Sequence, residues 1–351
     1  MIVEQVVRFV SGRRARVVAM GEPMHGPEAF PALRNAILEA LPDCAAVAIE
    51  SDSLAGLAID EFVRGGPGDL DEVVGGLSPA FRGIAANRAL IAGLRESRGV
   101  RFAAIDVPVG FRGGESPRRS ARLLHEAAGR PGTWARLDAL IGDDDLWTRP
   151  IAVPAELRDL AAELVWRMQV ALPEVDPGAA RAGELAARTV GGLLAYHAAV
   201  SGGGLSAQER LVTGLGIRDR AMAENVFTLE RTAGQVLLFA HNEHVRRGRA
   251  RVDWDGLDLR WTSAGAHLAH SFGARYVVFA TAVGTAPDHG VGEPPPGTLE
   301  GLLARDPTPR LVPTSEIDTT GLVRRPSQPG YLSLDPATLT DADAVLFLPT
   351  V

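Results

Sequence analysis

Six short, unbroken apolar runs constrain most strongly what this chain can fold into. They lie at residues 16–21, 44–51, 100–106, 235–242, 275–283 and 344–350. Because their apolar residues are continuous rather than alternating, the runs are typical of strands that a parallel sheet buries on both faces. Segments with apolar residues three and four positions apart, such as 28–41 and 87–98, predict helices between them. The pattern predicts an α/β fold with a mostly parallel central sheet flanked by helices.

The middle of the chain has a different pattern. From about residue 116 to residue 231 no segment predicts a strand, and the apolar spacing is helical at 154–172, 183–200 and 207–232. Breaks rich in proline and glycine separate these helices. We therefore predict that residues 1–115 and 233–351 form the two parts of the α/β core, and that residues 116–232 form a helical insertion, or cap.

Composition argues against several classes of protein. The net charge of −7 and the lack of an arginine-rich face interleaved with aromatic residues argue against a nucleic-acid partner. No apolar run is long enough to span a membrane, and the first residues lack the pattern of a secretory signal, so we expect a cytoplasmic protein with no membrane partner. Cys44, the single cysteine, is expected to be a core residue. The expected partner is a small molecule, and the sequence leaves the oligomeric state open.

Ionisable residues follow four of the apolar runs. In open α/β sheets, ligands bind beyond the carboxyl ends of the strands. We therefore expect the side chains at these ends to converge on one edge of the sheet. They are Glu22, His25, Glu50, Asp106, His241, Asn242 and His244. Glu243 interrupts this set, and on an extended segment it is expected to point to solvent, because alternate residues face opposite ways.

Each of these residues also has an ordinary structural explanation. A carboxylate at a strand-to-helix junction can cap the helix that follows, and a single histidine there is more often structural. The joint pattern favours a functional site, because carboxylates buried at strand ends need partners and the histidines supply them. His267, near the start of an amphipathic helix before the fifth run, is a further candidate to face this site.

Two chemistries suit this cluster. In the first, a histidine activates water while carboxylates tune it and other histidines polarise the electrophile. In the second, Glu22, His25, His241 and His244 hold a divalent metal ion that generates hydroxide. The spacing favours the first, because H-x-x-H directly after a strand differs from the helical H-E-x-x-H of zinc proteases. The chain has neither a phosphate-binding P-loop nor the G-x-S-x-G elbow of serine hydrolases.

Several segments resemble the erythromycin esterase family, whose members hydrolyse the lactone ester of 14-membered macrolides. The similar segments include VVAMGEPMHGPEAFPALRNAIL, VAIESDSLAGLAIDEFV, FAAIDVP, GIRDRAMAENV, VLLFAHNEHV and SAGAHLAHSFGARYVVFATAVG. The motifs G-E-x-x-H-G and H-N-x-H, in this order, are the most specific part. The phrases GEP, ESDSLAGL and RDRAMAEN look closer to uncharacterised actinobacterial members than to the antibiotic resistance enzymes. The helical middle is similar only at its end, in GIRDRAMAEN.

The resemblance implies a role for each matching residue. His25 would take a proton from water, and Glu22 and Glu50 would orient and tune it. His241, His244 and Arg34 would stabilise the oxyanion or position the substrate. The further candidates for substrate binding are Asp106, Asn242 and His267.

The activity implied is hydrolysis of an ester or lactone, as in a macrolide or another bulky natural product. It would proceed without a covalent intermediate and without a cofactor. The alternatives are a metal-dependent hydrolase that uses the same cluster, a biosynthetic enzyme that catalyses a cyclisation or an elimination, and a binding protein without turnover. A shared fold and pocket do not decide between these activities.

Overall fold

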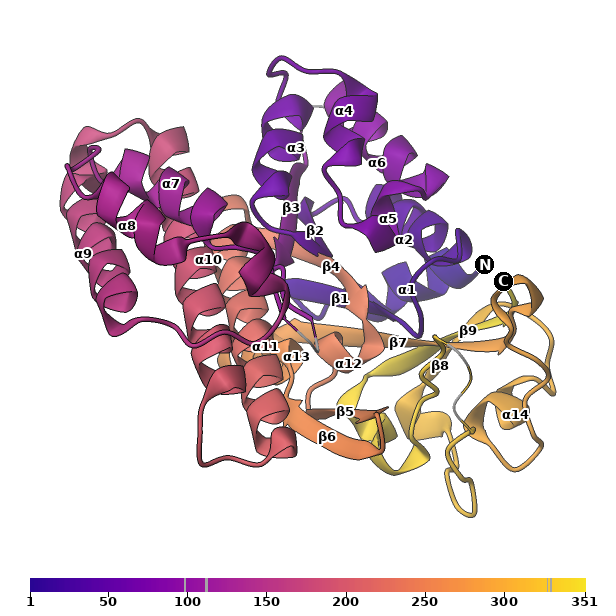
Figure 1. Ribbon diagram of the computed structural model, residues 1–351. Coiled ribbons are helices and arrows are strands. Elements are labelled where there is room, and N and C mark those ends of the chain that lie inside the picture. Colours follow the sequence, from indigo (N-terminus) through magenta and orange to yellow (C-terminus); the bar gives the residue numbers. More distant parts are fainter. Residues whose placement is uncertain (98, 111–112, 327, 329) are drawn as a thin grey trace.

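The computed structural model describes residues 1–97, 99–110, 113–326, 328 and 330–351 (Figure 1). Its strands are β1 (Val17–Glu22), β2 (Cys44–Asp52), β3 (Arg101–Asp106), β4 (Gln235–His241), β5 (Arg249–Trp254), β6 (Leu257–Thr262), β7 (Tyr276–Thr285), β8 (Arg310–Pro313) and β9 (Ala344–Thr350). Seven of them form one sheet in the order β3-β2-β4-β1-β7-β9-β8. Neighbouring strands of this sheet run parallel except the edge strand β8, which is antiparallel to β9. The predicted α/β fold is confirmed.

Helices surround this sheet. The α-helices are α1 (Ile2–Val10), α2 (Ala29–Ala40), α3 (Ala55–Val63), α4 (Leu70–Gly75), α5 (Pro79–Arg82), α6 (Ala85–Ser97), α7 (Arg118–Ala127), α8 (Trp134–Ile141), α9 (Ala155–Ala171), α10 (Pro177–Ser201), α11 (Ala207–Ala233), α12 (Asn242–Val245), α13 (Ala264–Phe272) and α14 (Leu299–Leu303). Short 3-10 helices cover Asp144–Thr148, Leu172–Glu174, Gly273–Arg275, Pro287–His289, Thr314–Glu316 and Pro336–Asp341. None of the helices in the described residues is long and apolar enough to cross a membrane.

The two faces of the sheet pack against different helices. Val18 and Met20 of β1 belong to a core that includes α1, α2, α3, α4 and α6. Val17 and Ala19, which alternate with them along the strand, belong to a second core that includes α11 and α13. Because alternate side chains of a strand point to opposite faces, a strand buried between two helical layers must be apolar at every position. This explains the unbroken apolar runs.

The six apolar runs coincide with β1, β2, β3, β4, β7 and β9, so their prediction as strands is confirmed. The sequence analysis missed β8 and the hairpin of β5 and β6. β8 has four residues and is only half-buried, so it carries no continuous apolar signal. The hairpin alternates apolar and polar residues, and it turns at Asp255 and Gly256, which both have positive φ. Asp-Gly is a typical sequence for such a two-residue turn.

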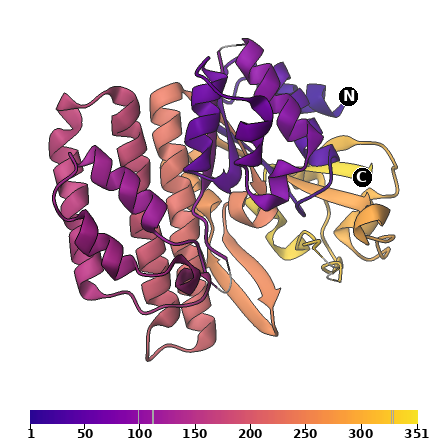
Figure 2. The same cartoon turned by 45° about the horizontal axis from the view of Figure 1, so that its top comes forward.

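Residues 116–231 contain helices and no strand, as the sequence predicts. Figure 2 shows these helices, in magenta and pink, gathered on one side of the sheet. The last of them, α11, also packs on the sheet through Met222, Val226 and Leu229. The division into residues 1–115, 116–232 and 233–351 remains a prediction, but α11 contributes to both the insertion and the core.

Candidate active site

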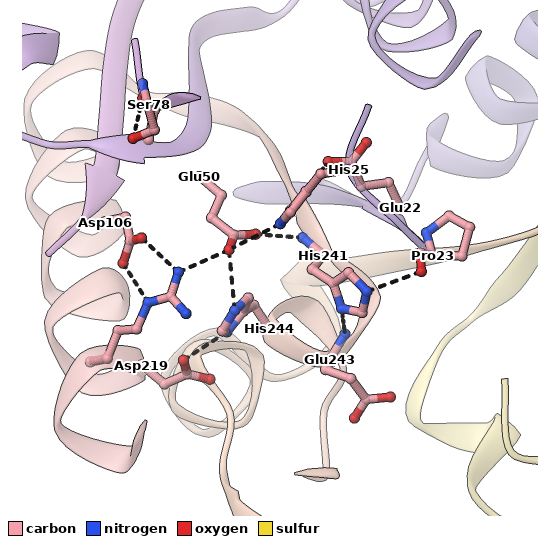
Figure 3. A network of polar contacts seen from close by, with 12 residues as sticks. Glu22, Pro23, His25, Glu50, Ser78, Asp106, Asp219, His241, Glu243 and His244 are labelled. Carbon is pink, nitrogen blue, oxygen red and sulfur yellow. Dashed lines mark hydrogen bonds and ion pairs between the residues drawn. The ribbon is translucent and has the colours of Figure 1, made fainter. Parts of the chain in front are cut away.

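The predicted convergence of the strand ends is present in the fold. β3, β2, β4 and β1 are consecutive neighbours in the sheet. Glu22 pairs in register with His241, and Asp52 pairs in register with Asp106. Because these strands are parallel, their carboxyl ends form one edge, and the side chains that follow them meet there. Figure 3 shows them as a single network of polar contacts.

Glu50, near the end of β2, is at the centre of this network (Figure 3). Its Oε2 accepts the backbone N–H of His241 at 2.8 Å, and its Oε1 accepts a hydrogen bond from Nη2 of Arg218 at 3.1 Å. The Nε2 atoms of His244 and His25 lie 3.3 and 3.7 Å from the same Oε1. Burial alone would raise the pKa of Glu50, but the charges of His244 and His25 hold it well below its usual value.

His25 and Glu22 form a carboxylate–histidine pair. Nδ1 of His25 lies 2.7 Å from Oε1 of Glu22, and about a third of the His25 side chain is exposed, against 1% for Glu22. Burial lowers the pKa of His25, but Glu50 and Glu22 outweigh it and raise the value to about 10. Burial also raises the pKa of Glu22. Since 3.7 Å to Glu50 is too long for a hydrogen bond, Nε2 of His25 remains available to a water or a substrate.

His244 belongs to a second pair of the same kind. Its Nδ1 lies 2.7 Å from Oδ1 of Asp219, whose Oδ2 accepts the backbone N–H of Ala264 at 3.0 Å. Burial lowers the pKa of His244, but Asp219 and Glu50 raise it to about 10. His244 is therefore a buried imidazolium held between two carboxylates.

His241 differs from the other two histidines because both its ring nitrogens bind backbone groups. Nδ1 accepts the N–H of Glu243 at 3.2 Å, and Nε2 donates to the carbonyl of Pro23 at 3.1 Å. This arrangement requires the neutral ring. Burial lowers its pKa to about 3, with further lowering by His25 and His244. The structure therefore gives His241 a clear role as the N-cap of α12.

Arg218 and Asp219, adjacent residues in α11, are site residues that sequence reasoning missed. Arg218 donates from Nε and Nη2 to the two carboxylate oxygens of Asp106, at 2.8 and 2.7 Å, as well as to Glu50. Burial raises the pKa of Asp106 even though Arg218 opposes this. The available signal was the charged triplet RDR within an otherwise amphipathic helix, in the segment GIRDRAMAEN that resembles the family.

Three other predicted residues lie around the network rather than in it. Arg34 is fully buried on α2 and donates to the side chains of Asn35 and Asn87, close enough to Glu22 for their charges to interact. Asn242 uses both atoms of its side-chain amide on the backbone of Thr281. His267 is separate from the network, since it lines a pocket of about 600 Å³ between α10, α11, the β5–β6 hairpin and α13.

The prediction that Glu243 points to solvent is wrong. Residues 242–245 form the short helix α12 instead of an extended segment, so the alternation of a strand does not apply. Glu243 is buried, pairs with Arg246 at 3.0 Å and accepts the backbone N–H of Arg251 at 2.7 Å. It anchors α12 to the β5 strand.

The four residues of the metal alternative do not form a metal-binding set. Glu22, His25, His241 and His244 would need free lone pairs that point to one position. Both ring nitrogens of His241 are used by the backbone, and those of His244 face Asp219 and Glu50. Within the described residues, no group of three or more histidine, cysteine, aspartate and glutamate side chains is placed so that it could hold a metal ion.

Comparisons with solved structures show the same fold. A Bacillus cereus protein has 15% sequence identity and a TM-score of 0.72, over 98% of this chain and 91% of that chain. A succinoglycan biosynthesis protein has 13% identity and a TM-score of 0.69, over 99% and 90%. A mutant of the erythromycin esterase EreC, in its open conformation, has 18% identity and a TM-score of 0.66, over 99% and 93%. No curated protein matches the sequence.

The sequence also matches a protein-family model. The match includes Glu50, Asp106, Arg218, Asp219, His241 and His244, and it begins after the GEPMHG segment that holds Glu22 and His25. Because the model described as erythromycin esterase matches residues 42–344, most of the chain, this protein belongs to the erythromycin esterase family.

Proposed function

We propose that this protein hydrolyses an ester or lactone by activating a water molecule with His25. The observation that carries the proposal is the Glu22–His25 pair, with Nδ1 2.7 Å from a carboxylate oxygen and Nε2 3.7 Å from Glu50, beyond hydrogen-bond distance. This is the arrangement of a general base whose ring orientation and tautomer are fixed by a carboxylate. In the part of the chain that the structure describes, no serine, threonine or cysteine is a hydrogen-bond partner of His25, which supports water as the nucleophile.

The reaction has two steps. In the first step, a water molecule hydrogen-bonded to Nε2 of neutral His25 attacks the carbonyl carbon of the ester. A new C–O bond forms, the electron pair of the C=O π bond moves to the carbonyl oxygen, and His25 takes a proton from the water. The tetrahedral intermediate then collapses, the ester C–O bond breaks, and the leaving alkoxide takes the proton from His25. The carboxylic acid product releases its proton to solvent. Positive charge on Arg218 and His244, held in the same buried cluster, favours the negative intermediate.

The substrate class is part of the proposal. Membership in the erythromycin esterase family and the fold shared with EreC support an ester in a macrolide or another bulky natural product. No observation favours a cyclisation, an elimination or binding without turnover over hydrolysis. The occupied nitrogens of His241 and His244 count against the metal-dependent alternative.

The test is hydrolysis of a panel of macrolides, lactones and simple esters, followed by mass spectrometry with and without a chelator. His25→Ala should lower kcat/KM by at least about 100-fold, because a positioned general base contributes 100-fold or more. His270→Ala, at an exposed histidine on α13, is the matched control and should leave the rate unchanged. Turnover that the chelator abolishes, or that His25→Ala retains, contradicts the proposal. So does an acyl-enzyme detected in the intact protein mass.

A further inference from the structure

Two carboxylate–histidine pairs meet at one oxygen atom in this site (Figure 3). Nδ1 of His25 and Nδ1 of His244 each lie 2.7 Å from a carboxylate, Glu22 in the first pair and Asp219 in the second. The Nε2 atoms of both rings face Oε1 of Glu50, at 3.7 and 3.3 Å. The two pairs differ in exposure, since a third of His25 is exposed and only 8% of the His244 side chain is.

The difference in exposure gives the two pairs different tasks. His25 can reach a substrate, whereas His244 is enclosed and its Nε2 faces Glu50. A buried imidazolium is costly unless its partners are fixed. Asp219 meets this requirement, because it is itself fully buried and its second oxygen is bound to the backbone N–H of Ala264, at the start of α13. Both oxygens of Asp219 are thereby held in place.

Among the groups around His244, Asp219 and Glu50 are the carboxylates that favour its charged form. Asp219 approaches from α11 and Glu50 from β2, both within direct contact of the ring. His241, in the same turn of chain, has its ring centroid 6.4 Å away and is neutral in its hydrogen-bonded form. Arg218 pairs with Asp106 and also donates to the Oε1 of Glu50 that His244 faces.

We propose that Asp219 is a positioning residue that holds His244 as an imidazolium against Glu50, so that His25 can release its proton. The inference rests on the proposed function. The charge on His244 partly neutralises Glu50 and also repels a proton on His25, which otherwise lies between two ionised carboxylates. Without this charge, Glu50 and Glu22 would hold the proton of His25 more tightly, and the base would be less available at any given pH.

The test is Asp219→Asn, which keeps the shape of the side chain and removes its charge. The ¹⁵N signals of the imidazole rings should show His244 doubly protonated at about pH 8 in the wild type and titrating near ordinary histidine values in the variant. The pH at which His25 titrates should increase by about one unit, and the rise of kcat/KM with pH should shift by the same amount. This is the size expected when one charge is lost a few ångströms from a partly buried group.

Glu224→Gln is the matched control, since Glu224 lies on the same helix and pairs with Arg220 outside the site. It should leave both titrations unchanged. A purely structural role for Asp219 would lower kcat or the melting temperature without moving the titration of His25, and that result overturns the inference.

Two further outcomes separate the inference from the proposed function. A wild-type His244 that is neutral at about pH 8 refutes the inference, even if Asp219→Asn does not fold. If the wild type hydrolyses no ester, the proposed function fails, but the histidine titrations of the wild type and the variant still show whether Asp219 sets the charge of His244 and the basicity of His25.

Discussion

At the scale of single residues, the protonation of His25 decides when the site can act. His25 is partly exposed, and the carboxylates of Glu22 and Glu50 beside it are buried. They raise its pKa to about 10. A general base works in its neutral form, so below this pKa the active fraction falls about tenfold for each unit of pH. We expect kcat/KM to increase with pH from about 6 to about 9, without the plateau near neutrality that an ordinary histidine would give.

The pH–rate profile of the wild type measures this directly, and Glu22→Gln is its internal control. Glu22→Gln removes one of the two negative charges that hold the proton on His25, so the rise of kcat/KM should move to lower pH. The maximal rate should fall, because a carboxylate no longer orients the His25 ring. A wild-type limb near pH 6.5 would show that Glu22 and Glu50 are not both ionised next to His25. A limb that does not move in Glu22→Gln would show that another group titrates.

At the scale of secondary structure elements, the position of His244 depends on how closely α12 approaches β1. A Cβ added at Gly21 would lie 2.3 Å from Oδ1 of Asn242 and 2.9 Å from Cγ2 of Val245. Asn242 cannot move freely, because its amide binds the backbone of Thr281. We expect Gly21→Ala to displace α12, lower the free energy of unfolding by about 1–3 kcal/mol and reduce kcat.

Thermal unfolding and ester turnover, measured on the same preparations, test this expectation. Gly93→Ala is the matched control, because Gly93 is exposed in α6 and a Cβ there meets nothing within 4 Å. In a helix interior this change should stabilise the protein by roughly 0.5–1 kcal/mol. A Gly21→Ala variant with the stability and kcat of the wild type would show that α12 has room to shift.

The elements also show which parts of the site the sequence can predict. Glu22, Asp106 and His241 end buried strands and Glu50 lies near the end of another, so the parallel sheet alone brings them together. Arg218 and Asp219 reach the same place from a helix, and Arg218 stands 168 residues after Glu50 in the chain. Their arrival depends on how α11 packs across the sheet, which apolar periodicity does not specify. Glu243 was mispredicted for a related reason, since one helical turn after β4 reverses which side chains face inward.

At the scale of the whole molecule, α11 joins the helical insertion to the site. Along this helix, Leu215 packs with the β5–β6 hairpin, and Met222 and Val226 pack on the sheet. Arg218 and Asp219 lie between Leu215 and Met222 in the chain, and their side chains enter the site. Ion pairs connect the insertion to the core elsewhere, Arg119 with Asp52, Arg181 with Asp60 and Glu230 with Arg16. The site is therefore complete only when the insertion is docked, and a loss of stability in the insertion should reach the catalytic centre.

We expect one histidine to make the stability of this insertion depend on pH. His197 of α10 is fully buried against the rings of Trp147 and Tyr196, and neither of its ring nitrogens has a hydrogen-bond partner within the described residues. Burial lowers its pKa to about 4, below the unfolded value of about 6.5. Between these two values the unfolded chain binds the extra proton, so stability is full above about pH 6.5 and falls as the pH decreases towards 4.

We expect His197→Phe to remove this dependence, because phenylalanine retains the edge-to-face ring contacts and cannot be protonated. Between about pH 7.5 and 4.5 the wild type should lose roughly 2 kcal/mol more of its unfolding free energy than the variant, as measured by urea denaturation at each pH. His241, which is also buried and neutral, contributes equally to both proteins, so the difference between them isolates His197. His270→Gln, at an exposed histidine, should follow the wild type. If the wild type and His197→Phe lose the same stability in acid, then His197 is not held as the neutral ring, and acid acts on the molecule through other groups.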